Sequence, residues 1–174
     1  MKIRYFVVVA ILFVAVTFRI LWVNHEYPQA DNVKIEKGKC YVDQEEISYK
    51  VKETKWLNKE QIKEEYGMEL LSVCIVTMQV ENTSKYKKRI TACDWYIEGE
   101  NYFGNGISSD LFFAMNEHLS DMDLVLEPGE RKVWNLPFEF CNTFQYSFKN
   151  ENEVQKTSYG VVRERYPRKI WMMI

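Results

Sequence analysis

The sequence predicts a mostly β protein: an antiparallel β-sandwich with two short helical insertions, preceded by one N-terminal transmembrane helix. Three observations support this prediction. Residues 5–23 form an apolar run of membrane-spanning length. Aromatic residues make up 15% of the chain, and aromatic and β-branched residues favour strands. Beyond residue 46, short segments that alternate apolar and polar residues are separated by turn signals, as in antiparallel sandwiches.

The apolar run would span ~28 Å as a helix, which is close to the thickness of a bilayer's hydrocarbon core. Lys2 and Arg4 precede the run, as basic residues do in a secretory signal. The nearest small-x-small cleavage pattern, residues 15–17, lies inside the run, so we expect an uncleaved signal-anchor. Arg19 interrupts the run near its end, where a long side chain can snorkel to the headgroups.

We therefore expect an anchor in residues 1–23, a polar stalk in residues 24–32 and one β-sandwich domain in residues 33–174. The basic residues at the N-terminus favour an N-terminus inside the cell and a domain outside it. The expected location is the cell membrane, crossed once.

The charge of the predicted outer part makes some partners improbable. Lys2, Arg4 and Arg19 precede residue 24, which leaves 20 basic residues against 25 acidic ones and a net charge of about −5. Nucleic acids and broadly anionic surfaces are poor partners for such a domain. We expect no nucleic acid partner.

The first half of the domain is predicted to contain two kinds of element. Period-two alternation predicts strands over residues 47–51, 70–81 and 90–98. Asn58 and Gln61 have the spacing of a capping box, and Gly67 is a suitable stop, so a helix is expected over residues 59–66. Asn82-Thr83-Ser84 is interpreted as a turn, although it also matches a glycosylation acceptor.

The second half continues this pattern after a second helix, which Ser109-Asp110 opens. Further strands are expected near residues 124–126, 134–140, 144–148, 158–163 and 170–174, with a polar turn over residues 149–156. Pro137 should mark an edge strand or a bulge, because proline cannot donate to a ladder.

Several of these segments together resemble a known group of domains. They are Val80-Glu81-Asn82-Thr83-Ser84, a Trp-bearing strand, Leu126-Glu127-Pro128-Gly129-Glu130, Leu136-Pro137-Phe138 and Arg165-Tyr166-Pro167-Arg168-Lys169. The pattern is similar to that of immunoglobulin-like extracytoplasmic domains of unknown function, found behind an N-terminal anchor in Firmicutes and especially in Clostridia. The resemblance covers about residues 45–174. It implies an immunoglobulin-like sandwich and supplies no catalytic residues.

The cysteines permit disulfides without fixing their pairing. All four follow the anchor, and an even count outside the membrane allows three pairings. Cys74, Trp95 and Cys141 match the order of an antibody-type domain, so the resemblance suggests a Cys74–Cys141 bridge. Glu139 stands where such domains have a tyrosine, and Cys40 or Cys93 are alternative partners.

No motif for catalysis, cofactor binding or metal binding is recognisable, so we expect a non-enzymatic protein without cofactor or metal. The sequence has no G-x-S-x-G elbow, no phosphate-binding glycine loop and no EF-hand spacing. Tyr102, Phe103 and Ile107 flank two glycines in a long loop and are candidates for a partner contact, since loops on sandwiches commonly carry function. An ordinary packing role is the alternative.

The functional hypothesis from sequence is a membrane-anchored module that binds a protein partner at the cell envelope. One alternative is an enzyme or a small-ligand carrier with an unrecognised site, which requires a concave pocket with convergent polar groups. Another is an accessory subunit of a transporter or sensor, which Arg19 would join to its partner inside the membrane.

Overall fold

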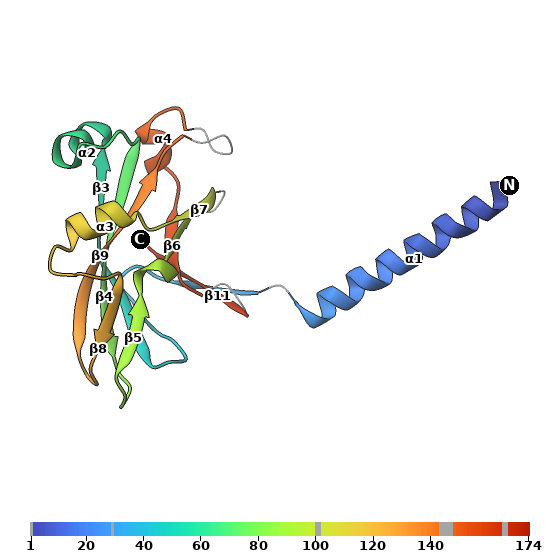
Figure 1. Cartoon of the computed structure of the whole chain (residues 1–174), viewed down its shortest axis with the longest axis horizontal. Coiled ribbons are helices and arrows are strands. Elements are labelled where there is room, and N and C mark those ends of the chain that lie inside the picture. The colour runs from blue at the N-terminus through green and yellow to red at the C-terminus, as the bar shows by residue number, and fades with distance from the viewer. Residues whose placement is uncertain (1, 29, 100–101, 143–147, 165–166) are drawn as a thin grey trace.

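The structure, a computed structural model, describes residues 2–28, 30–99, 102–142, 148–164 and 167–174. Its first element is helix α1 (Lys2–Glu26), which Figure 1 shows outside the β-rich domain. The segment 27–30 connects α1 to the first strand, so the connection is shorter than the stalk expected from sequence. Among the described residues, one helical stretch is long and apolar enough to cross a membrane: Tyr5–Glu26, with 22 residues.

The rest of the chain forms a five-stranded, a four-stranded and a two-stranded sheet. The five-stranded sheet has the order β1-β11-β10-β6-β7, with β1 (Asp31–Ile35), β6 (Tyr96–Gly99), β7 (Tyr102–Gly106), β10 (Tyr159–Val162) and β11 (Arg168–Met173). The four-stranded sheet has the order β2-β3-β4-β9, with β2 (Cys40–Val42), β3 (Ile47–Asn58), β4 (Ser72–Asn82) and β9 (Arg131–Phe140). The two-stranded sheet pairs β5 (Lys88–Thr91) with β8 (Asp123–Leu126). The described pairs are antiparallel except β1 with β11, so the prediction of a mostly antiparallel β fold is confirmed.

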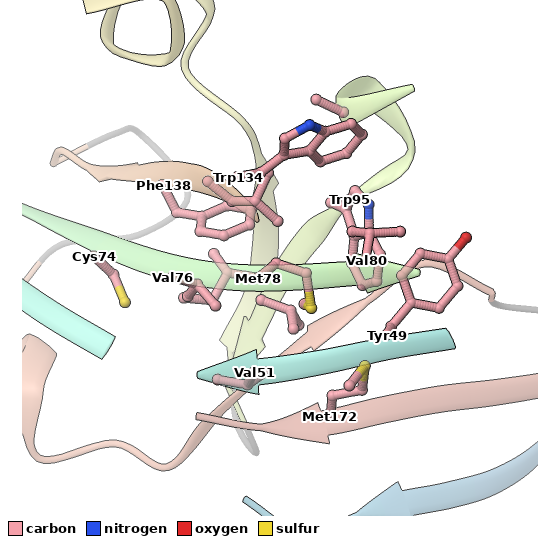
Figure 2. Close-up of a cluster of buried hydrophobic side chains, with 14 of the residues drawn as sticks. Tyr49, Val51, Cys74, Val76, Met78, Val80, Trp95, Trp134, Phe138 and Met172 are labelled. Atoms are coloured by element: carbon pink, nitrogen blue, oxygen red, sulfur yellow. The ribbon is translucent and has the colours of Figure 1, made fainter. Parts of the chain in front are cut away.

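The main core lies where the sheets face one another, and Figure 2 shows part of it. The predicted alternation in β9 is confirmed, because Trp134, Leu136, Phe138 and Phe140 are all fully buried. In β4 the buried residues Cys74, Val76, Met78 and Val80 face the same core. Met172 of β11 contributes from the other sheet (Figure 2). Burial of these large side chains is the main source of the domain's stability.

Both predicted helices are present and cover the outer face of the four-stranded sheet. They are α2 (Lys59–Tyr66) and α3 (Ser109–Met115). Asn58 and Gln61 form the expected capping box, and Gly67 ends α2 with a φ of 69°. A second apolar cluster lies beneath these helices and comprises Leu57, Ile62, Val73, Ile75 and Leu111. This cluster explains why β4 is buried on both faces at its start.

Two sequence predictions need correction, and a third lies largely outside the described residues. The expected strand over residues 90–98 is two strands in different sheets, β5 and β6, separated by the 3₁₀ turn η1 (Ala92–Asp94). Cys93 is consequently exposed, whereas Trp95 and Ile97 are buried. The expected polar turn over residues 149–156 contains helix α4 (Glu151–Gln155). The strand expected at residues 144–148 lies largely outside the described residues, although Phe148 packs against the main core.

The turn motif at Asn82 is explained by burial and hydrogen bonds. The Asn82 side chain donates to the carbonyls of Tyr86 and Leu126 at 2.7 and 3.0 Å, and it accepts from the backbone and hydroxyl of Ser84. Its backbone exchanges hydrogen bonds with Gly129 and Glu130. The two motifs that begin at Val80 and Leu126 are therefore partners in one joint, and a fully buried Asn82 fits the interpretation as a turn.

Candidate functional site

A cleft of 510 Å³ lies close to the start of β1, and we call it the tether cleft. Its lining residues are Asp43, Gln44, Glu45, Asp94, Tyr96, Arg163, Glu164 and Pro167. They come from the turn between β2 and β3, the junction of η1 with β6, and the segment between β10 and β11. The backbone N–H of Asp31, at the start of β1, donates to the Pro167 carbonyl at 3.1 Å. The cleft therefore lies beside the start of β1, the first strand that follows α1 in the chain.

Asp43 shapes the turn that forms one wall of the cleft. Its Oδ1 accepts hydrogen bonds from the backbone N–H groups of Glu45 and Ile47, both at 2.9 Å. Such a local bond from an aspartate stabilises a turn. Within this turn Glu46 adopts a φ of 62°, which is uncommon for a residue other than glycine. The Asp43 side chain thus supports a backbone conformation that is unfavourable by itself.

The second carboxylate oxygen of Asp43 joins the two large sheets. Oδ2 forms an ion pair with Arg163, which follows β10, and accepts a hydrogen bond at 3.1 Å from the hydroxyl of Tyr49 in β3. The side chains of Asp43 and Arg163 are 2% and 17% exposed. The Arg163 guanidinium also lies over the Tyr49 ring, 5.0 Å from its centroid. These three groups form a buried clamp, which we call the Asp43 clamp.

Burial changes the protonation behaviour of this clamp. Burial raises the pKa of the Tyr49 hydroxyl, and the nearby Asp43 carboxylate raises it further, while Arg163 opposes the change. Burial alone would lower the pKa of Arg163, but its attraction to Tyr49 and Asp43 outweighs that effect and raises this pKa. At neutral pH the clamp therefore holds a neutral tyrosine and a charged arginine.

A second contact across the sheets joins Tyr41 and Glu164. The hydroxyl of Tyr41, in β2, donates to the Glu164 carboxylate at 3.1 Å. Burial, together with this hydrogen bond, raises the pKa of Tyr41 to about 12. Glu164 is thereby held at the rim of the tether cleft.

The tether cleft is acidic. Four carboxylates line it, those of Asp43, Glu45, Asp94 and Glu164, and the one basic lining residue is Arg163, whose charge Asp43 already neutralises. A cleft with this charge attracts cationic groups and repels anions. No histidine or cysteine is among the lining residues, so the cleft lacks the usual nucleophile and base pair. Within the described part of the chain, no group of three or more His, Cys, Asp or Glu residues is placed to hold a metal ion.

The partner-contact residues expected from sequence lie elsewhere. The backbone of Tyr102 and Phe103 belongs to β7, but their side chains lie outside the described structure. Ile107 is partly buried against the main core and lines a smaller cavity with Cys141. A role of these residues in partner binding stays a prediction.

The expected disulfide is not formed in the structure. All four cysteines lie in described segments and are free thiols, with Cys74 buried and Cys141 partly exposed. Burial raises the pKa of the Cys74 thiol well above its ordinary value, which makes it unreactive. The Cys74–Cys141 bridge stays a prediction that peptide mapping can test.

The residues of the Asp43 clamp are not evident from sequence. Asp43 and Arg163 are 120 positions apart. Each looks like an ordinary charged residue at the end of a strand, and only the sheet topology brings them together. The one available signal was local: an aspartate four residues before the predicted strand at Ile47 is typical of a tight turn.

Comparisons with known proteins give a family and a fold. The model of a domain of unknown function, DUF5028, matches residues 24–170. No curated protein matches the sequence. The crystal structure of the yjhA protein from Bacillus subtilis is similar, with a TM-score of 0.53 and 12% sequence identity, over 78% of this chain and 85% of that chain. This likeness shows a shared fold.

Two other solved structures have lower scores. A conserved hypothetical protein from Bacillus anthracis has a TM-score of 0.48 and 14% identity, over 78% of this chain and 94% of that chain. An uncharacterised β-sandwich protein from Clostridium difficile 630 has a TM-score of 0.46 and 8% identity, over 84% of this chain and 96% of that chain.

Proposed function

The chain belongs to the DUF5028 family of domains of unknown function, and we propose that this member is a non-enzymatic, membrane-anchored module that binds a protein partner outside the cell membrane. The observation that carries the proposal is that the apolar helix α1 lies outside the domain and is not covered by it. The apolar part of the helical stretch Tyr5–Glu26 is not buried against the domain, so the domain does not use it as a core helix. An apolar helix of this length is stable when lipid covers it.

The proposed orientation places the N-terminus inside and the domain outside. Lys2 and Arg4 precede the apolar helix, and positive charge is retained on the cytoplasmic side. The segment 27–30 then keeps β1, and with it the tether cleft, near the membrane. A module held in this way meets partners that are themselves at the membrane.

The tether cleft is the surface that we propose for the partner. Its carboxylates favour a basic segment, and electrostatic complementarity contributes specificity and a fast association rate. The Asp43 clamp fixes the cleft walls before a partner arrives, so little ordering is required on binding.

The test is site-specific photo-crosslinking in intact cells with the full chain. A crosslinking residue at Gln44, in the tether cleft, should give a discrete adduct with one basic membrane or envelope protein. The same residue at Glu60, on the exposed side of α2, is the matched control and should give none. Glu45→Lys should weaken the adduct, because it reverses a charge in the cleft.

Two results would contradict the proposal. The first is an identical set of adducts from Gln44 and Glu60, which would mean that crosslinking reflects proximity to the membrane alone. The second is a specific adduct at Gln44 that survives Glu45→Lys and Asp94→Lys, which would remove charge complementarity as the basis of binding.

A further inference from the structure

A second cavity lies at the far end of β10 from the tether cleft, and we call it the distal cavity. Tyr159, which begins β10, lines the distal cavity, whereas Arg163, just after β10, lines the tether cleft. The distal cavity has a volume of 280 Å³. Its lining residues are Lys37, Thr54, Trp56, Gln155, Thr157, Ser158, Tyr159, Met173 and Ile174. It is therefore bounded by β3, by the segment from α4 to β10, and by the end of β11.

One wall of the distal cavity is aromatic. The ring of Trp56 packs against the rings of Phe140 and Tyr159, with centroids 5.4 and 5.6 Å apart. Trp56 stays partly exposed, while Tyr159 is 4% exposed. The Trp56 ring is thus held by its packing and offers a rigid apolar surface to the cavity.

The other walls carry polar side chains that form no hydrogen bond within the described part of the domain. The Thr54 hydroxyl is buried and has no hydrogen-bond partner in the described structure. A buried hydroxyl without a partner is costly, so a ligand or water that bonds to it is stabilised. The side chains of Gln155, Thr157 and Ser158 also have no recorded partners among the described residues and add hydroxyl and amide groups around the same space.

The charge of the lining differs from that of the tether cleft. Lys37 is the one charged side chain that lines the distal cavity, and the lining includes no carboxylate side chain. The cavity therefore does not favour a cation. Hydroxyl and amide groups, which both donate and accept hydrogen bonds, match a ligand that is itself rich in hydroxyl groups.

We propose that the distal cavity binds one sugar ring, neutral or N-acetylated, of a glycan. A sugar has an apolar C–H face for Trp56 and hydroxyl groups at its edges for Thr54, Gln155 and Thr157. The volume of 280 Å³ is near the lower end of the range for small-molecule pockets, about 300–1,000 Å³, which suits one ring. This inference depends neither on the anchor nor on the proposed protein partner.

The test uses the full chain in zwitterionic micelles, because detergents with sugar headgroups would compete. N-acetylglucosamine and methyl α-glucoside are the probes, and saturation-transfer NMR with a titration measures binding. We expect saturation transfer to at least one of the two sugars, with a dissociation constant in the millimolar range. No transfer to either sugar at tens of millimolar overturns the proposal and leaves water as the partner of Thr54.

Variants then locate the binding. Thr54→Val removes the unpartnered hydroxyl and suits a strand, so the protein should fold and bind the sugar about three- to tenfold more weakly. Gln155→Ala, at the exposed end of α4, should also weaken binding. Thr83→Val, at a turn in another part of the domain, is the matched control and should bind as the unchanged protein does. Equal binding by Thr54→Val and Gln155→Ala would place the sugar elsewhere and overturn the proposal.

Discussion

At the residue scale, burying the charges of the Asp43 clamp costs desolvation free energy, and the hydrogen bonds and ion pair of Asp43 offset that cost. Removing an ion pair from water costs several kcal/mol per ion, and attraction offsets this only when the remaining hydrogen-bonding positions are also satisfied. Asp43 meets this condition, because it accepts bonds from two backbone N–H groups, from Tyr49 and from Arg163. The clamp therefore contributes more to positioning the two sheets than to net stability.

The clamp should be sensitive to the loss of one partner. Asp43→Asn leaves the buried Arg163 without its counter-ion, so we expect the free energy of unfolding to fall by about 3–5 kcal/mol. Urea denaturation of the full chain in micelles measures this. Glu69→Gln is the matched control, because it removes an ion pair in which Lys63 and Glu69 are 63% and 73% exposed, and it should cost less than about 1 kcal/mol. Equal costs for both variants would show that the clamp is not buried in solution.

Alkaline pH should destabilise the domain through two tyrosines whose pKa values are raised in the folded state. Tyr41 has a pKa raised to about 12 and the pKa of Tyr49 is also raised, whereas a tyrosine in the unfolded chain titrates near pH 10. The folded state therefore holds more protons than the unfolded state above about pH 10. The free energy of unfolding is at its full value below that pH and should fall as pH rises from about 10 to 12.

A phenylalanine variant identifies the tyrosine responsible. Tyr49→Phe should make the alkaline loss of stability smaller, because one of the shifted groups is gone. Tyr86→Phe, at a tyrosine that is 75% exposed, is the control and should leave the loss unchanged. Denaturation at several pH values between about 8 and 12 provides the comparison. An unchanged loss in Tyr49→Phe would exclude Tyr49 as its source.

At the scale of elements, β9 shows how the domain protects an edge strand. β9 is the edge strand at one end of the four-stranded sheet, which agrees with the edge position that Pro137 indicated in the sequence. The segment 105–116 covers its free edge. Asn116 donates to the Asn135 carbonyl at 2.9 Å and accepts from the Asn135 N–H at 3.0 Å, and the N–H of Ser108 donates to the Pro137 carbonyl. An open edge would otherwise be a template for association with another chain.

Loss of this cover should cause both instability and self-association. Asn116→Ala removes a side chain that is 1% exposed and leaves the backbone of Asn135 unpaired, so we expect a loss of about 2–3 kcal/mol. Size-exclusion chromatography should show larger species in addition. Asn152→Ala, at an exposed position in α4, should change stability by less than about 0.5 kcal/mol. A variant Asn116→Ala that is as stable and monodisperse as Asn152→Ala would contradict this role.

Elements marked by a strong short-range sequence pattern could be predicted from the sequence. Elements without such a pattern could not. The capping box of Asn58 and the alternation that ends at Phe140 are short-range patterns, and both were predicted correctly. The strands β1 and β2 are short and largely exposed, so they carry little hydrophobic pattern. The break between β5 and β6 depends on a three-residue turn, in which the Thr91 hydroxyl accepts from the Cys93 N–H at 3.3 Å. Period-two alternation does not reveal when the chain changes sheets.

At the scale of the whole molecule, the candidate sites depend on topology. The tether cleft combines segments around residues 43, 94 and 163, and the distal cavity combines segments around residues 37, 54 and 157. These segments are far apart in the sequence, so their proximity could not be predicted from it. The apolar helix, in contrast, depends on composition over one continuous segment and was predicted directly.

The first and last strands of the domain lie side by side in this arrangement. β1 is the first strand after α1 and pairs in parallel with β11, from Asp31 with Arg168 to Ile35 with Met172. Helix α1 is therefore joined to a strand pair that begins next to the tether cleft, where Pro167 lines the cleft and accepts a hydrogen bond from the Asp31 N–H.

The location of the domain is best tested with its own cysteines. Cys40 and Cys93 are exposed, so a membrane-impermeant maleimide should label them in intact cells after reduction with an impermeant phosphine. A variant with Cys40→Ser and Cys93→Ser is the control and should lose most of the label, because Cys74 is buried and Cys141 is only partly exposed. Labelling in intact cells, with a cytoplasmic protein left unlabelled, is the result that we expect. Labelling that requires cell lysis would place the domain inside the cell and contradict the proposed function.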